Sequence, residues 1–105
     1  MHLIIKYLSK RNLSITNSYS DWYKVALAIA NSFTYDIGEK YFLRLSKLDV
    51  NKYDEQKCRT LLKYCYENSK GKFNFGTIVY LAIKVGYIYK NSNRGVVLKM
   101  AVTAS

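Results

Sequence analysis

The chain has 105 residues and half of them are hydrophobic, so it is long enough to form one domain around a core of its own. Its 17 Lys and Arg against 7 Asp and Glu give a net charge of +10, which indicates an anionic partner such as nucleic acid; a basic surface that serves solubility alone is the alternative. The apolar run at the start is too short for a signal peptide and too interrupted to span a membrane, so we expect a cytoplasmic protein with no membrane association.

Two helices are predicted in the first third of the chain. The first covers residues 2–10. The second begins at Ser18, which has capping-box spacing to Asp21, or at the equally suitable cap Ser20, and runs to about residue 33. The side chains expected to face the core are Leu3 and Tyr7, with Ile4 and Leu8 beside them, in the first helix, and Trp22, Val25, Ala26, Ile29 and Phe33 in the second.

The third predicted helix has the clearest separation of apolar and charged faces. Asp36 and Glu39 have capping-box spacing, which predicts a helix over about residues 36–48. On a helical wheel, Lys40, Arg44 and Lys47 cluster on one side, away from the apolar residues. The apolar side consists of Ile37, Tyr41, Leu45 and Leu48.

Polar caps define two further helices. Asp54 is expected to cap a fourth helix that runs to about residue 68, and Asn74 a fifth helix that ends at Gly86. Their inward residues are expected to be Cys58, Leu61, Leu62 and Cys65, and Ile78, Leu81, Ala82 and Val85. The fold class is therefore all-α, a compact bundle of about five short helices over residues 1–88. Residues 89–105 form a basic and apolar tail, either a short hairpin or a disordered junction, and we favour the junction.

A set of residues spread over positions 21–86 occurs in an order that is typical of one protein family. They are Asp21-Trp22-Tyr23-Lys24-Val25, Gly38, Phe42, Ser46, Tyr53, Cys58, Asn74-Phe75-Gly76-Thr77, Leu81-Ala82 and Gly86. This order resembles the primase C-terminal (PriCT-type) family, a helical domain that follows the polymerase core in primases of plasmids, phages and other mobile elements. The resemblance covers about four-fifths of the chain. It implies an accessory module that grips single-stranded template, with a nucleotide as a further ligand, beside a polymerase or helicase domain.

No catalytic constellation is found in the sequence. The acidic residues are mostly placed as helix caps, and no carboxylate pair suits two-metal phosphoryl transfer. Cys58 and Cys65 lack the spacing of a zinc site, and His2 is the single histidine. We therefore expect no cofactor, no metal and no enzymatic activity of the chain by itself.

Basic residues interleaved with aromatic residues favour a nucleic-acid site. Charge follows the phosphate backbone of a single strand, while aromatic rings stack on its bases. A second candidate is the start of the fifth helix, where Asn74, Gly76 and Thr77 present backbone N–H groups to a phosphate. The alternatives are an ordinary solvated helix face and an ordinary helix start. The residues predicted to bind nucleic acid are Lys40, Arg44, Lys47, Arg59, Lys63, Tyr66, Lys70 and Lys72.

Two other functions are compatible with this composition. One is a protein-interaction module that docks an acidic replication or mobilisation partner. The other is a duplex-DNA binder of the helix-turn-helix type. No predicted helix carries Arg, Asn and Gln together at base-reading positions, which argues against this last hypothesis.

Overall fold

The computed structural model describes residues 1–68, 71 and 73–88, and these form five α-helices without a strand. The predicted all-α bundle is confirmed for this part of the chain. The hairpin or junction expected over residues 89–105 lies outside the described residues. The helices are α1 (His2–Arg11), α2 (Tyr19–Ser32), α3 (Tyr35–Ser46), α4 (Glu55–Asn68) and α5 (Phe75–Lys84).

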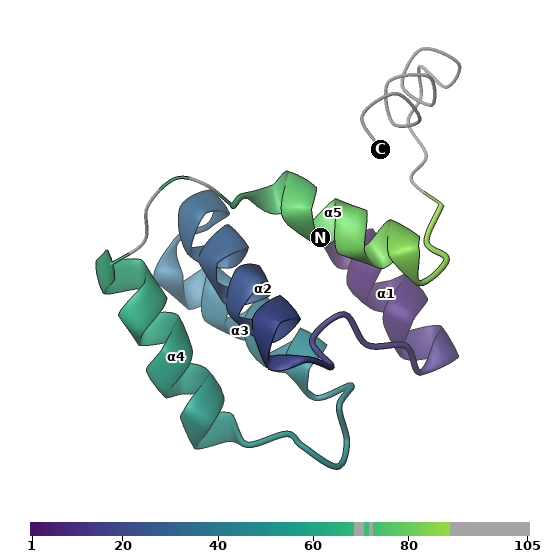
Figure 1. The fold of residues 1–105 in the computed structure, drawn as a ribbon, viewed down its shortest axis with the longest axis horizontal. Helices are drawn as coiled ribbons and strands as arrows, with labels where there is room; N and C mark the ends of the chain where they lie inside the picture. Colours follow the sequence, from purple (N-terminus) through teal and green to yellow (C-terminus); the bar gives the residue numbers. More distant parts are fainter. Residues whose placement is uncertain (69–70, 72, 89–105) are drawn as a thin grey trace.

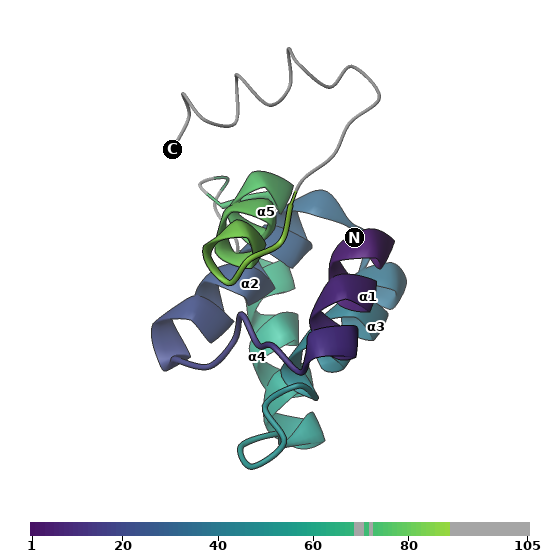
Figure 2. The same ribbon diagram turned by 90° about the vertical axis from the view of Figure 1, so that its right-hand side faces the viewer.

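Helix α2 is the centre of the bundle. It packs against α3, α4 and α5, with α4 on one side and α5 on the other (Figure 1). Helix α1 lies on the far side from α4 and packs against α3 and α5, as the turned view also shows (Figure 2). Among the described residues, no helix is long and apolar enough to cross a membrane.

The core lies where α2, α3 and α4 meet and extends to α1 and α5. Val25 and Ile29 from α2, Phe42 and Leu45 from α3, and Leu62 from α4 have no solvent exposure. Both cysteines are buried and free, as the sequence predicts. Trp22 and Phe33, which were expected in the core, are only half-buried and pack against it.

The inward faces of α1 and α3 differ from those expected. Helix α1 buries Ile4, Ile5 and Leu8, while Leu3 is 65% exposed, because it lies about 150° from the centre of that stripe, on nearly the opposite face of the helix. Helix α3 buries Gly38, Phe42 and Leu45, and Ile37 is 45% exposed. The predictions for Leu3 and Ile37 were therefore wrong. Helix α3 contacts three other helices. Its buried face therefore includes the small residues Gly38 and Ser46, which allow the neighbouring helices to pack closely against it.

Local signals determine the starts of α2, α4 and α5 and the end of α5. The Ser18 hydroxyl accepts a hydrogen bond from Asp21 N at 3.1 Å, so Ser18, not Ser20, is the cap of α2. Asp54 caps α4 by accepting from Lys57 N, and Asn74 caps α5. Gly86 follows α5 with a φ of 111°, the left-handed conformation that favours glycine after a helix.

The capping box predicted for α3 does not form. The helix begins one residue earlier, at Tyr35, with Thr34 as N-cap, and the Thr34 hydroxyl donates to Asp36 instead of capping the helix. Glu39 does not cap the helix start: its carboxylate accepts from the side-chain hydroxyl of Tyr35 and pairs with Arg59 of α4. A contact between two helices thus replaces the local interaction that the sequence predicts.

Candidate nucleic-acid interface

Lys40, Arg44 and Lys47 form an exposed row on α3, which we call the α3 basic row. All three side chains are solvent-exposed, and none forms an ion pair with a described residue. The face of α3 that carries Phe42 and Leu45 is buried, so the row points away from the core. Lys47 Nζ lies 5.9 Å from the ring centre of Tyr53, in the loop between α3 and α4.

One carboxylate lies at the N-terminal end of this row. The Thr34 hydroxyl donates to Asp36 Oδ1 at 2.8 Å. This hydrogen bond, then one from the backbone of Ile37, and more weakly the charge of Lys40, lower the pKa of Asp36. Asp36 therefore stays ionised and offsets part of the positive charge near Lys40.

Arg59 of α4 is bound to two carboxylates. Its Nη1 lies 2.6 Å from Glu39 Oε2 and its Nη2 lies 2.9 Å from Glu55 Oε2. The hydrogen bond with Glu55 and the charge of Glu39 raise the pKa of Arg59. Arg59 thus joins α3 to α4, and its role in nucleic-acid binding remains a prediction. Lys63, one turn further along α4, is exposed and has no such partner among the described residues.

Tyr66 of α4 forms hydrogen bonds with the backbone of the segment that joins α2 to α3. Its hydroxyl lies 2.7 Å from the carbonyl oxygen of Phe33 and 3.0 Å from that of Thr34. Burial raises its pKa to about 12. The same hydroxyl occupies the space where a Cβ on Gly38 would lie. Tyr66 therefore has a structural role here, and base stacking by its ring stays a prediction.

At the start of α5, the backbone N–H groups of Gly76 and Thr77 donate hydrogen bonds to Asn74. Asn74 Oδ1 accepts from Gly76 N at 2.8 Å, and the Asn74 carbonyl accepts from Thr77 N at 2.8 Å. Asn31 of α2 ties the preceding segment by donating to the carbonyl of Phe73. Phosphate binding by Asn74, Gly76 and Thr77 stays a prediction. Lys70 and Lys72, also predicted to bind, lie outside the described residues.

Several of the residues that carry the family resemblance lie around the indole ring of Trp22 in the structure. Trp22 stacks on Phe42, with ring centres 5.9 Å apart and an angle of 23° between the planes. Its Nε1 donates to Ser46 Oγ at 3.2 Å. Ser46, Tyr53 and Cys58 line the same pocket as the indole. The order of residues along the sequence thus corresponds to a cluster in space.

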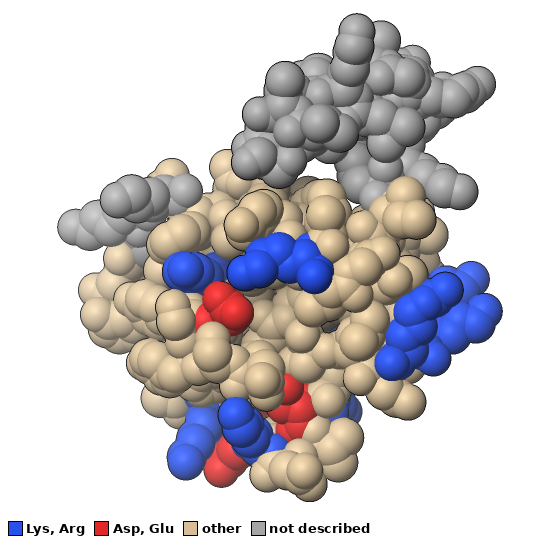
Figure 3. Space-filling model, turned by 45° about the vertical axis from the view of Figure 1, so that its right-hand side comes forward, with Lys and Arg blue, Asp and Glu red and all other residues tan. Residues whose placement is uncertain are grey.

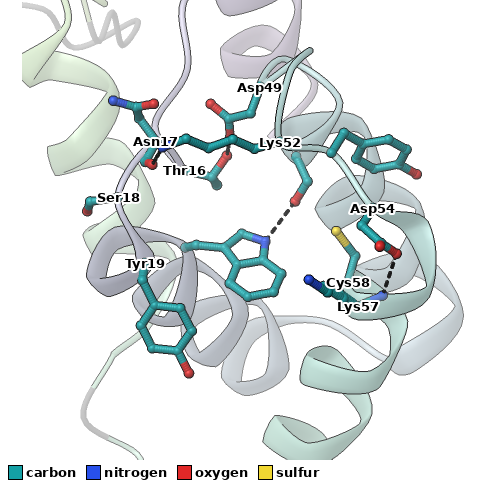
Figure 4. Close-up of a pocket in the computed structure, with 12 residues that line it drawn as sticks. Thr16, Asn17, Ser18, Tyr19, Asp49, Lys52, Asp54, Lys57 and Cys58 are labelled. Carbon is teal, nitrogen blue, oxygen red and sulfur yellow. Dashed lines mark hydrogen bonds between the residues drawn. The ribbon is translucent and has the colours of Figure 1, made fainter.

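A pocket of about 250 Å³ lies beside this indole (Figure 4). Two contacts join the loops that frame it: the Thr16 hydroxyl donates to the Asp49 carboxylate, and Lys52 Nζ donates to the carbonyl of Asn17 at 2.9 Å. Lys57 borders the pocket from the first turn of α4. The loops before α2 and after α3 are therefore held together over the indole.

A second, open hollow of about 650 Å³ adjoins this pocket between α2 and α4. Tyr19, Trp22 and Lys57 line both. This site is not predicted from the sequence, because the helical spacing of Trp22 places it with the core residues of α2. The available signal was the spacing of tyrosines and basic residues on the two helices. The residues that line the hollow are Tyr19, Trp22, Tyr23, Gln56, Lys57, Thr60, Leu61 and Tyr64.

The distribution of charged and metal-ligating side chains bears on which ligands the described surface could bind. On the face in Figure 3, Lys and Arg side chains form separate groups, with acidic side chains between them. Within residues 1–68, 71 and 73–88, no three His, Cys, Asp or Glu side chains gather in a group that could hold a metal ion.

These features define a small helical domain with a basic row and an aromatic hollow. Residues 4–82 match the family model Primase C terminal 2 (PriCT-2). The chain therefore belongs to this family and is a primase-associated C-terminal module. No curated protein and no solved structure gave a significant match to the chain.

Proposed function

We propose that this domain holds single-stranded template for a primase or primase-helicase of a mobile element. A polymerase or helicase domain would make or use the primer, and the module would raise the local concentration of template beside it. The family supplies the association with primases. The net charge of +10 supports a polyanionic ligand. We place this activity in the cytoplasm, where replication of such an element takes place.

The observation that carries the proposal is the α3 basic row. Lys40, Arg44 and Lys47 extend over roughly 10 Å of helix axis, a length that passes more than one phosphate of a strand. Their charges are free of ion pairs with described residues. Lys63 adds a further free charge on α4. The proposed contacts therefore depend on phosphates and carry little sequence preference.

A second candidate is docking to an acidic protein partner. The observation that favours it is Ile37, which is 45% exposed beside the α3 basic row. An apolar side chain among lysines suits a protein surface that combines carboxylates with an apolar contact. In this case the row would bind Asp and Glu side chains of a replication protein instead of phosphates.

Fluorescence anisotropy with a labelled single-stranded oligonucleotide tests the proposal. We expect weak binding at low salt, with little sequence preference and a steep loss of affinity as salt rises from about 50 to 200 mM, because neutralised phosphates release counterions. Absence of binding at low salt would contradict the proposal and favour the acidic protein partner. Primer extension should require the natural polymerase domain, and turnover by the chain alone that survives repurification would also contradict it.

A further inference from the structure

We propose that the hollow between α2 and α4 holds a single unstacked nucleobase against Trp22, with Tyr19 and Tyr64 flanking it and Lys57 beside its phosphate. This inference deepens the proposed function, because it adds a base-binding site to the phosphate contacts of the α3 basic row. It rests on residues that those contacts do not use.

The first argument is the fixed orientation of Trp22. One side of the indole lies on Phe42, and the ring N–H is bound to Ser46, which is only 3% exposed. The indole is nevertheless half-buried and lines both the pocket and the hollow. A ring that is already held in place loses little conformational freedom when a ligand stacks on it, which is the condition for an effective binding platform.

The second argument is the exposure of the surrounding tyrosines. Tyr19 is 70% exposed and Tyr64 is 52% exposed, yet they lie on two different helices and line the same hollow. The ring of Tyr19 lies 5.8 Å from that of Trp22 and 6.3 Å from that of Tyr23, nearly parallel to the latter. Exposed rings on two walls of one hollow suit a flat ligand, since every nucleobase has π-faces for stacking.

Volume and charge agree with this ligand. The hollow of about 650 Å³ falls within the range of small-molecule sites, so a base fits with room for its sugar. Lys57 is exposed and its ammonium group has no partner among the described residues. Lys57 is the single charged side chain among the described residues that line the hollow, and no carboxylate is among them. The free charge at the hollow is therefore positive, which complements a phosphate.

The experiment uses the complete chain and its single tryptophan as the probe. Fluorescence of Trp22 is recorded at low salt with three ligands: a single-stranded oligonucleotide, an abasic strand of the same length, and a free mononucleotide. We expect the strand with bases to quench Trp22, and the abasic strand to bind through its phosphates without quenching. The mononucleotide distinguishes the two sources of a base: quenching and competition by it would indicate that free nucleotides also enter the hollow.

Matched variants separate stacking from charge. Tyr64→Ala should weaken binding of the strand with bases by roughly 5- to 150-fold, the range for loss of one base–aromatic stack, and should leave binding of the abasic strand unchanged. Tyr80→Ala is the control, because Tyr80 is also 52% exposed but lies on α5 outside the hollow. Circular dichroism should show both variants folded, since these side chains are mainly in solvent.

The outcomes distinguish the two proposals. Equal affinity for strands with and without bases, together with no quenching by any ligand, would overturn the base site while leaving the phosphate contacts intact. Equal behaviour of Tyr64→Ala and Tyr80→Ala would overturn it as well. Loss of all strand binding would contradict the proposed function, and quenching of Trp22 by the mononucleotide would then still decide whether the hollow accepts a base.

Discussion

The indole N–H of Trp22 donates a hydrogen bond to the hydroxyl of Ser46, 24 residues further along the chain, at a distance of 3.2 Å. The bond joins the start of α2 to the end of α3. It holds the indole where a buried helix face meets an open hollow. The indole therefore packs against the core on one side and lines the hollow on the other.

We predict that the two residues are energetically coupled. Ser46→Ala should lower the free energy of unfolding by about 1–3 kcal/mol, because it leaves the indole N–H without its acceptor in a largely buried place. In a Trp22→Phe background the same substitution should cost less, since no N–H remains to be satisfied. Urea denaturation of the four proteins in this double-mutant cycle measures the coupling. Strictly additive costs would show that the bond contributes nothing.

Gly38 should not tolerate a methyl group. Alanine is favoured over glycine in a helix by about 1 kcal/mol, so Gly38→Ala would stabilise an unconstrained helix. Here the added Cβ collides with the Tyr66 hydroxyl and comes within 2.7 Å of Ile29 Cγ2. We expect a net destabilisation of about 1–3 kcal/mol by urea denaturation.

Two controls make the prediction for Gly38 specific. Gly71→Ala should change stability by no more than about 0.5 kcal/mol, because no heavy atom lies within 4 Å of the position of its Cβ. Adding Tyr66→Phe should reduce the cost of Gly38→Ala, because the colliding hydroxyl is removed. A stabilised Gly38→Ala variant would show that α2, α3 and α4 pack less closely at this point.

The protein should lose stability at alkaline pH. Burial raises the pKa of Tyr66 from 10.0 to about 12 and that of Cys65 from 9.0 to about 11. Below about pH 9 both groups are neutral in the folded and unfolded states, so their contribution is fully present. As pH rises, the unfolded chain releases these protons first, so stability falls through about pH 11 for Cys65 and about pH 12 for Tyr66.

Urea denaturation at a series of pH values tests this dependence. Tyr66→Phe should flatten the loss of stability in the upper part of the range, where the tyrosine hydroxyl titrates, and leave the lower part, to which the buried thiols of Cys65 and Cys58 contribute because burial raises the pKa of both. A wild-type profile in the variant would show that other groups cause the alkaline loss.

The helices could be predicted because their limits depend on neighbouring residues. Asp54 and Asn74 each bind an N–H within three residues, and Gly86 adopts a left-handed conformation two residues after the last residue of α5. Such interactions are visible in a window of a few positions. The choice between Ser18 and Ser20 needed the structure, because both have a suitable hydroxyl.

The remaining features depend on contacts that a local pattern does not contain. Glu39 has the position of a capping-box residue, but its carboxylate binds Arg59, 20 residues away, and not a backbone N–H at the start of α3. Tyr66 lies three residues after Lys63 and four before Lys70 in the sequence, yet its hydroxyl is bound to the carbonyls of Phe33 and Thr34 after the end of α2. The hollow exists only because α2 and α4 pack side by side. The α3 basic row, in contrast, follows from the helical period alone, and the structure exposes it as expected.

The central claim is that the α3 basic row contacts the phosphates of a single strand. The direct measurement compares strand affinity over a range of salt concentrations for the wild type and for two triple variants of equal net charge. One carries Lys40→Glu, Arg44→Glu and Lys47→Glu. The other carries Lys6→Glu, Lys10→Glu and Lys84→Glu, at exposed positions on α1 and α5.

Both variants should keep the helical circular dichroism of the wild type, since exposed charge changes shift stability by no more than about 0.5 kcal/mol each. The α3 variant should lose most of its affinity, and the slope of log affinity against log salt should become shallower by about 2, as expected for three lost phosphate contacts on a single strand. The α1 and α5 variant should retain most of the wild-type slope. Equal losses in the two variants would contradict the claim, because binding would then depend on net charge and not on the row.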